Sequence, residues 1–158
     1  MNFQDIDINF LSYSLCSKNR EIVSYNNKKS LEIFTPLVEI KIIKDSYDNQ
    51  YIQLDLSEYS KFKELINIID LHCMIHHNIT EKTRDKFKSS LFHDLLSCKI
   101  IKNQGRKITI NNVPSTIYEL QNGDKAKCVV YIDNVWTNSE IVSLKWKLKV
   151  CCVYRNDK

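Results

Sequence analysis

Lysine alternates with apolar residues along one stretch near the C-terminus of the chain. Lys145, Lys147 and Lys149 occupy every second position there. In a β-strand this spacing places three ammonium groups on one face about 7 Å apart, close to the spacing of phosphates along an extended nucleic-acid strand. The pattern predicts a cationic strand face that meets an anion. The opposite face is apolar and consists of Leu144, Trp146, Leu148 and Val150.

Positive charge is concentrated in the same part of the chain. Residues 1–97 contain 12 Lys or Arg and 14 Asp or Glu, a net charge of −2, whereas residues 98–158 contain 11 and 5, a net charge of +6. A basic half joined to a mildly acidic half indicates one face that binds a polyanion. A second interpretation stays open, in which the lysines belong to a solvated sheet face and protect an edge strand from aggregation.

Aromatic residues in the basic half extend this hypothesis to nucleic acid, because unpaired bases stack on exposed rings. Tyr131 and Trp136 are the predicted stacking residues, with burial as the alternative for each ring. Arginine occurs only four times, so base-specific bidentate contacts are not expected. The predicted nucleic-acid-binding residues are Arg106, Lys107, Lys125, Lys127, Tyr131, Trp136, Lys145, Lys147 and Lys149.

The segment from His72 to His77 contains three histidines and one cysteine, which are metal-binding residue types. On a helix, His72 lies one turn from His76, and Cys73 lies one turn from His77. Two such pairs do not face the same ion, and no acidic partner is near in sequence. We therefore expect no metal at this helix end, with Cys73 buried.

No nucleophile elbow, phosphate-binding loop or H-E-x-x-H motif occurs in the sequence. The adjacent Cys151 and Cys152 lie between valines, a setting that raises thiol pKa and lowers reactivity. We expect a binding protein that has no catalytic residue and needs no cofactor. The six cysteines form no C-x-x-C pair, and the N-terminus lacks the features of a signal peptide. Both observations favour a reducing, intracellular location without membrane insertion.

The chain length and the low content of glycine and proline, two residues of each, favour one domain over residues 1–158. Strands are predicted over 5–56, a helical middle over 57–97, and basic antiparallel strands over 98–154. Ile6, Ile8 and Phe10 alternate with polar residues as in a half-buried strand. Later strands are predicted over 99–102 and 107–113, as a hairpin, and over 127–136 and 141–153.

Two helices are predicted in the middle of the chain. The first follows Ser57 as its N-cap and ends near Asn78. The second begins near Thr80, and Phe87, Leu91 and Leu95 would share its apolar face. The fold class is therefore α+β, with a predominantly antiparallel twisted sheet or small barrel and two central helices. The predicted buried face of the first helix consists of Phe62, Leu65, Ile66, Ile69 and Cys73.

The order of these segments resembles a known family. The residues that carry the likeness are Leu31–Pro36, then Leu120, Gly123, Asp124 and Cys128, then Ile132, Val135 and Trp136, and finally the run Leu144–Val150. This arrangement is similar to the single-stranded-DNA-binding-like proteins of nucleocytoplasmic large DNA viruses, over residues 30–154. The resemblance implies an OB-like Greek-key β core, with Trp136, Trp146 and the neighbouring lysines at the matching positions.

The family resemblance and the basic half together give the functional hypothesis. It is a sequence-tolerant single-stranded DNA-binding protein, with DNA favoured over RNA, that supports viral replication, recombination or repair. Its partners would include viral replication proteins or further copies of itself, in the host cytoplasm, the nucleus or the virion. The alternative is a viral structural or host-interaction protein that binds a protein partner through a sheet edge or a helical face.

Overall fold

The computed structural model describes residues 1–28, 30–44, 49–100 and 107–156. This part of the chain is mostly β, with one α-helix, α1 (Ser60–His76), and four short 3₁₀ helices, η1 (Phe3–Asp5), η2 (Ile8–Phe10), η3 (Glu81–Lys86) and η4 (Ile117–Glu119). The strands are β1 (Leu11–Ser17), β2 (Arg20–Tyr25), β3 (Glu32–Phe34), β4 (Val38–Lys44), β5 (Gln50–Asp55), β6 (Phe87–Lys88), β7 (Leu91–Phe92), β8 (Leu95–Ile100), β9 (Lys107–Ile110), β10 (Val113–Pro114), β11 (Lys125–Thr137) and β12 (Val142–Tyr154).

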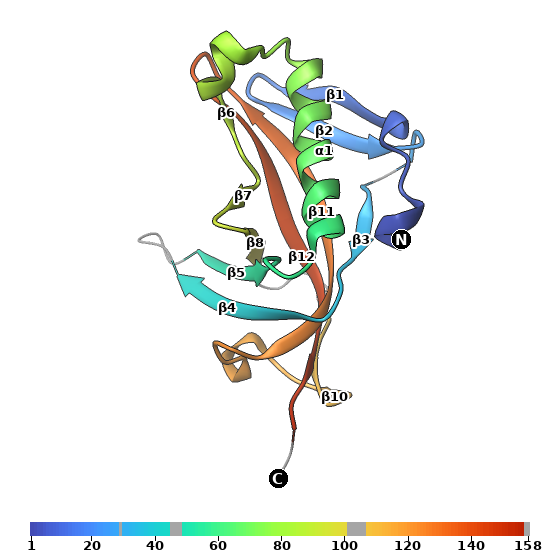
Figure 1. Ribbon diagram of the computed structural model, residues 1–158, viewed down its shortest axis with the longest axis vertical. Coiled ribbons are helices and arrows are strands. Elements are labelled where there is room, and N and C mark those ends of the chain that lie inside the picture. The colour runs from blue at the N-terminus through green and yellow to red at the C-terminus, as the bar shows by residue number, and fades with distance from the viewer. Residues whose placement is uncertain (29, 45–48, 101–106, 157–158) are drawn as a thin grey trace.

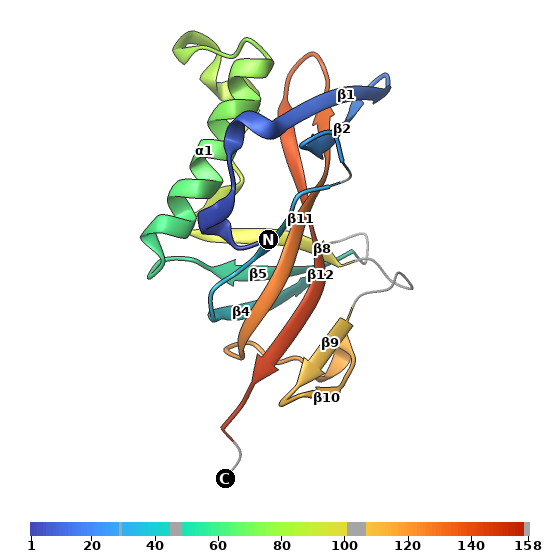
Figure 2. The same cartoon turned by 90° about the vertical axis from the view of Figure 1, so that its right-hand side faces the viewer.

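Five of these strands pair in a closed circuit (Figures 1 and 2). β4 pairs antiparallel with β5, and β5 pairs antiparallel with β8. β8 then meets β12 in parallel, β12 pairs with β11, and β11 returns to β4 through the pair Ala126 and Val38. Alternate side chains of these strands point inward, so the enclosed space is filled by apolar residues. Ile40, Ile52, Leu54 and Ile132 are fully buried there.

β11 and β12 form a long hairpin that extends beyond the circuit. At its far end β2 pairs with β11, and β1 pairs with β2 (Figure 2). The predicted alternation is confirmed, because Leu144, Trp146 and Leu148 are buried and the lysines between them are not. The parallel partners of β12, which are β6, β8 and β9, were not predicted. The hairpin predicted over 99–113 is wrong in the described residues, since β9 pairs with β12 and β10.

Helix α1 packs its predicted face into the core. Phe62, Ile66, Ile69 and Cys73 are buried, and Leu65 is half-buried. The predicted N-cap is wrong: Tyr59 occupies that position, and the backbone N–H of Ser57 donates to Asp55 Oδ1. Within the described residues, no helix has the length and the apolar composition that crossing a membrane requires.

The second predicted helix is also wrong. Residues 81–86 form η3, and the chain then enters the short strands β6 and β7 and the longer β8. His93 and Asp94 have φ values of 48° and 63°, which suit a two-residue turn between paired strands and stop a helix. Pairing with β5 and β12 therefore overrode the helical spacing of Phe87, Leu91 and Leu95. The strand predicted from Ile6 to Phe10 is wrong, because Ile8–Phe10 form the 3₁₀ helix η2 and β1 begins only at Leu11.

Candidate nucleic-acid interface

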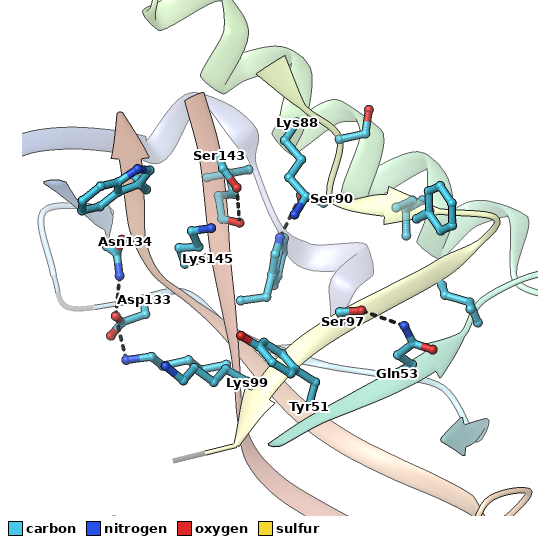
Figure 3. Close-up of a pocket in the computed structure, with 18 of the residues that line it drawn as sticks. Tyr51, Gln53, Lys88, Ser90, Ser97, Lys99, Asp133, Asn134, Ser143 and Lys145 are labelled. Carbon is cyan, nitrogen blue, oxygen red and sulfur yellow. Dashed lines mark hydrogen bonds and ion pairs between the residues drawn. The ribbon is translucent and has the colours of Figure 1, made fainter. Parts of the chain in front are cut away.

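A groove of about 960 Å³ runs along the outer side of the closed circuit, beside the β11–β12 hairpin (Figure 3). Its floor includes Tyr51 and Gln53 of β5 and Ser97 and Lys99 of β8. These four side chains share a face because Tyr51 pairs with Lys99 and Gln53 pairs with Ser97 in the antiparallel ladder. Gln53 Nε2 also donates to Ser97 Oγ at 3.2 Å. The segment of residues 88–92 and the hairpin form the walls.

An irregularity in the hairpin determines which residues face the groove. Ile132 pairs with Trp146 and Asn134 pairs with Lys145, so Asp133 is an extra residue between them. Beyond this bulge, Asn134 and Trp136 point the same way as Lys145 and line the groove with it. Asp133 Oδ2 forms an ion pair with Lys147 Nζ at 2.8 Å. Asp133 therefore neutralises Lys147 rather than Lys145.

Three lysines from different strands gather in this groove. Lys88 of β6, Lys99 of β8 and Lys145 of β12 all line it, and Figure 3 shows their side chains around one hollow. Burial lowers the pKa of Lys145, and the positive charges of Lys88 and Lys99 lower it further. Among the residues that the structure describes, no acidic side chain pairs with any of the three. The cluster is therefore a site where a bound anion would relieve repulsion.

Aromatic rings lie in the same groove as these lysines. Tyr51, Phe92 and Trp136 line it, and Phe92 is 72% exposed. A large apolar ring with that exposure has a face available for stacking. Trp146, in contrast, is only 4% exposed, and its Nε1 donates to Ser90 Oγ at 2.9 Å. Trp146 therefore supports the groove as part of the core, as the sequence predicted.

The arrangement of strands around this groove has been seen before. The C-terminally truncated single-stranded DNA-binding protein from bacteriophage Enc34 is 13% identical to this chain, with a TM-score of 0.54 over 95% of this chain and 96% of that one. The two proteins share a fold. A second structure of the Enc34 protein is 11% identical, with a TM-score of 0.55 over 94% and 91% of the two chains. Its complex with single-stranded DNA is 12% identical, with a TM-score of 0.51 over 94% and 97%.

No protein-family model matches this chain, and no curated protein sequence matches it. At 11–13% identity the likeness to the Enc34 protein lies in the backbone arrangement. The side chains of the groove are therefore interpreted from their own geometry.

The structure brings together only part of the predicted binding set. Trp136, Lys145 and Lys147 line the groove. Tyr131 is half-buried and pairs with Lys147 across the hairpin, outside the groove lining. Lys149 bonds to Glu32 of β3. Arg106 lies outside the described residues.

The remaining predicted lysines belong to a different part of the molecule. Lys125 and Lys127 lie at the start of β11, where they pair with Tyr154 and Cys152 of β12. Lys107 pairs with Val150 at the start of β9. All three are exposed, and none lines the groove. That these three lysines bind nucleic acid stays a prediction. The experiments below measure their contribution separately from that of the groove lysines.

Several groove residues were missed by the sequence interpretation. Lys99 and Ser97 alternate with the buried Leu96, Cys98 and Ile100, so a period of two in β8 was available as a signal. Lys88 and Phe92 were assigned to a helix that does not form. Arg20 and Tyr51 come from distant strands, and only the closed sheet places them beside the hairpin.

Behind the groove wall, a hydrogen-bonded chain links the helix to the hairpin. Asp70 of α1 is 3% exposed and accepts two bonds from Ser90, from its N–H at 2.9 Å and from its hydroxyl at 2.5 Å. The same hydroxyl oxygen accepts from Trp146 Nε1. Burial raises the pKa of Asp70 from 3.8 to about 6, and the bonds from Ser90 oppose this shift in part.

This raised pKa predicts a pH-dependent difference between the wild type and Asp70→Asn. Between pH 4 and pH 6 the folded state holds more protons than the unfolded state, so the contribution of Asp70 to stability falls as pH rises. We expect the free energy of unfolding of the wild type, relative to the variant, to fall by about 2 kcal/mol across this range. Urea unfolding followed by tryptophan fluorescence measures it. If the free energies of unfolding of the two proteins depend on pH in the same way, the pKa of Asp70 is not raised.

Proposed function

We propose that this protein binds single-stranded DNA in the groove, with little dependence on sequence. The observation that carries the proposal is the cluster of Lys88, Lys99 and Lys145 beside the rings of Phe92 and Trp136. Lysines would neutralise phosphates, and unpaired bases would stack on the rings. Because bases in a duplex are already stacked and paired, this combination favours a single strand.

The position of the groove in the fold supports the same proposal. We propose that β4, β5, β8, β11 and β12 form an OB-like barrel, in which the third and fifth strands are parallel neighbours, as β8 and β12 are. OB folds bind oligonucleotides on the face of strands 2 and 3 and beside the loop that joins strands 4 and 5. Here that face is β5 and β8, and that loop is the end of the β11–β12 hairpin. The groove lies between them.

The similar Enc34 structures also support single-stranded DNA as the ligand, since that protein is described as binding it. A role in viral replication, recombination or repair is a further part of our proposal. The relationship to proteins of nucleocytoplasmic large DNA viruses stays a prediction, because the similar structures come from a bacteriophage. The intracellular location and the preference for DNA over RNA stay predictions in the same way.

A second candidate function rests on an apolar stripe of helix α1. Ile68, Leu71 and Ile75 lie on its outer side, and all three are exposed. Their spacing of three and four residues places them on one face, where a protein partner could pack. If this were the main function, Leu71→Glu would abolish a protein complex and leave oligothymidine binding unchanged.

Fluorescence anisotropy with a labelled oligothymidine of about 30 nucleotides, longer than the site of one OB fold, tests the proposal directly. We expect log Kd to rise with log salt concentration with a slope of about 2 to 3, because three to five phosphates are neutralised. A duplex of equal length should compete poorly. If no binding is seen at low salt, or if Kd does not depend on salt concentration, the proposal that lysines bind DNA in the groove is wrong.

A further inference from the structure

Two histidines at the end of α1 lie beside a glutamate of β2. His76 is the last residue of the helix, His77 is its C-cap, and Glu21 comes from the hairpin of β1 and β2. The preceding residue, Arg20, pairs with Trp136 and lines the groove. Successive strand residues point to opposite faces, so Glu21 faces away from the groove and toward the helix. This cluster is therefore separate from the proposed DNA site.

The three side chains converge closely. His77 Nε2 lies 2.6 Å from Glu21 Oε1, and His76 Nε2 lies 3.4 Å from Glu21 Oε2. Each residue offers one ligand atom, and these atoms all lie within 4.8 Å of one another. A tetrahedral zinc ion with bonds near 2.0–2.2 Å holds its ligand atoms about 3.3 Å apart. The observed separations, from 2.6 Å up to at most 4.8 Å, bracket that spacing.

Two polar atoms in this cluster have no hydrogen bond. Glu21 Oε1 and His77 Nε2 are both buried, and although they form an ion pair, neither makes a hydrogen bond within the described part of the chain. Buried polar atoms in folded proteins are nearly always partnered. A cation between the carboxylate and the two imidazoles would satisfy both atoms at once.

Neighbouring side chains hold one of the histidines in position. The ring of Tyr13 stacks on His76, with centroids 4.4 Å apart and an angle of 25° between the planes. The Tyr13 hydroxyl is in turn hydrogen-bonded to His72 Nδ1 at 2.9 Å. This stacking limits rotation of the His76 ring, so less freedom is lost when a ligand binds. In functional metal sites, neighbouring side chains commonly fix the orientation of the metal-ligating residues.

We propose that Glu21, His76 and His77 bind one zinc ion, which fastens the β1–β2 hairpin to the end of α1. Both imidazoles would ligate through Nε2 and the glutamate through a carboxylate oxygen, with water as the fourth ligand. The sequence led us to expect no metal because the two pairs on the helix do not face the same ion and no acidic partner is near in sequence. The site instead uses adjacent histidines where the chain leaves the helix, and an acid 55 positions from His76.

Zinc titration of the full chain tests this site. Protein freed of metal with a chelator is titrated with zinc sulfate by calorimetry, and its Tm is measured with and without zinc. We expect one zinc ion per chain and a higher Tm. Glu21→Gln, His76→Gln and His77→Gln should each weaken zinc binding by at least about tenfold. The matched control is His93→Asn, an exposed histidine outside the cluster, which should bind zinc as the wild type does.

Two outcomes would overturn the proposal. If the wild type binds no zinc, the cluster is an ion pair between His77 and Glu21 only. If the three variants retain full binding, the metal binds elsewhere in the chain. Should a variant fail to fold, the absorption spectrum of the cobalt-loaded wild type still decides, since thiolate ligands give charge-transfer bands that nitrogen and oxygen ligands do not. The zinc result and the DNA result are independent, because neither set of variants touches the other site.

Discussion

Replacing Lys88, Lys99 and Lys145 together by glutamate should weaken oligothymidine binding by at least about 1,000-fold. Each lysine bonded to a phosphate contributes on the order of 1.5 kcal/mol, and the new carboxylates repel the backbone. The slope of log Kd against log salt should also fall by about 2, since three contacts that release counterions are lost. Anisotropy at two or more salt concentrations measures both quantities.

The chain offers a matched control for this variant. Lys107, Lys125 and Lys127 are three exposed lysines outside the groove, and replacing them by glutamate changes the net charge by the same amount. We expect less than about a threefold loss of affinity, from the long-range field alone. If this control loses more affinity than the groove variant, the DNA path runs along the start of β11 and the groove proposal is wrong. A Tm measurement on the groove variant checks its folding, because three clustered glutamates repel one another as the three lysines do.

Removing the rings should weaken binding by a different mechanism. Phe92→Ala combined with Trp136→Ala should weaken oligothymidine binding by about 30-fold or more, because stacking of one base on an aromatic side chain contributes about 1–3 kcal/mol. The salt slope should stay unchanged, since no charge is altered. The preference for a single strand over a duplex should shrink, because phosphates alone do not distinguish the two well.

Tyr118→Ala is the control for the ring variant. Tyr118 is 78% exposed on η4 and does not line the groove, so its loss should leave affinity and preference as they are. Equal affinity for oligothymidine in the ring variant and the wild type would refute stacking and leave a polyanion site without base contacts. A circular dichroism spectrum and a Tm for each variant separate lost contacts from lost folding.

Local patterns in the sequence predicted the elements whose residues pack against their own near neighbours. The alternation over Leu144–Leu148 gave that part of β12 its correct buried face, and the spacing of Phe62, Ile66 and Ile69 gave α1. These patterns are reliable because the two structures have periods of 2 and 3.6 residues. The end of α1 at His76 also lies close to the predicted stop at Asn78.

The failures come from contacts between distant parts of the chain. Residues 87–96 contain apolar residues at helical spacing, but pairing with β5 and β12 and the turn at His93 and Asp94 make them strands. The site was predicted as one basic strand face, whereas the bulge at Asp133 and the pairing of Lys147 with Lys99 set which lysines meet. Neither a bulge nor a parallel pairing leaves a local signal in composition or charge.

The central place of β12 has a consequence for how the chain folds during synthesis. β12 pairs with β11, β8, β9 and β6, and it completes the closed circuit. β4 and β5 are made about a hundred residues earlier, yet their core side remains open until residue 154 has left the ribosome. Contacts between such distant segments slow folding and expose unpaired strands in the meantime. The nascent chain therefore passes through a stage in which chaperones have apolar strand surface to bind.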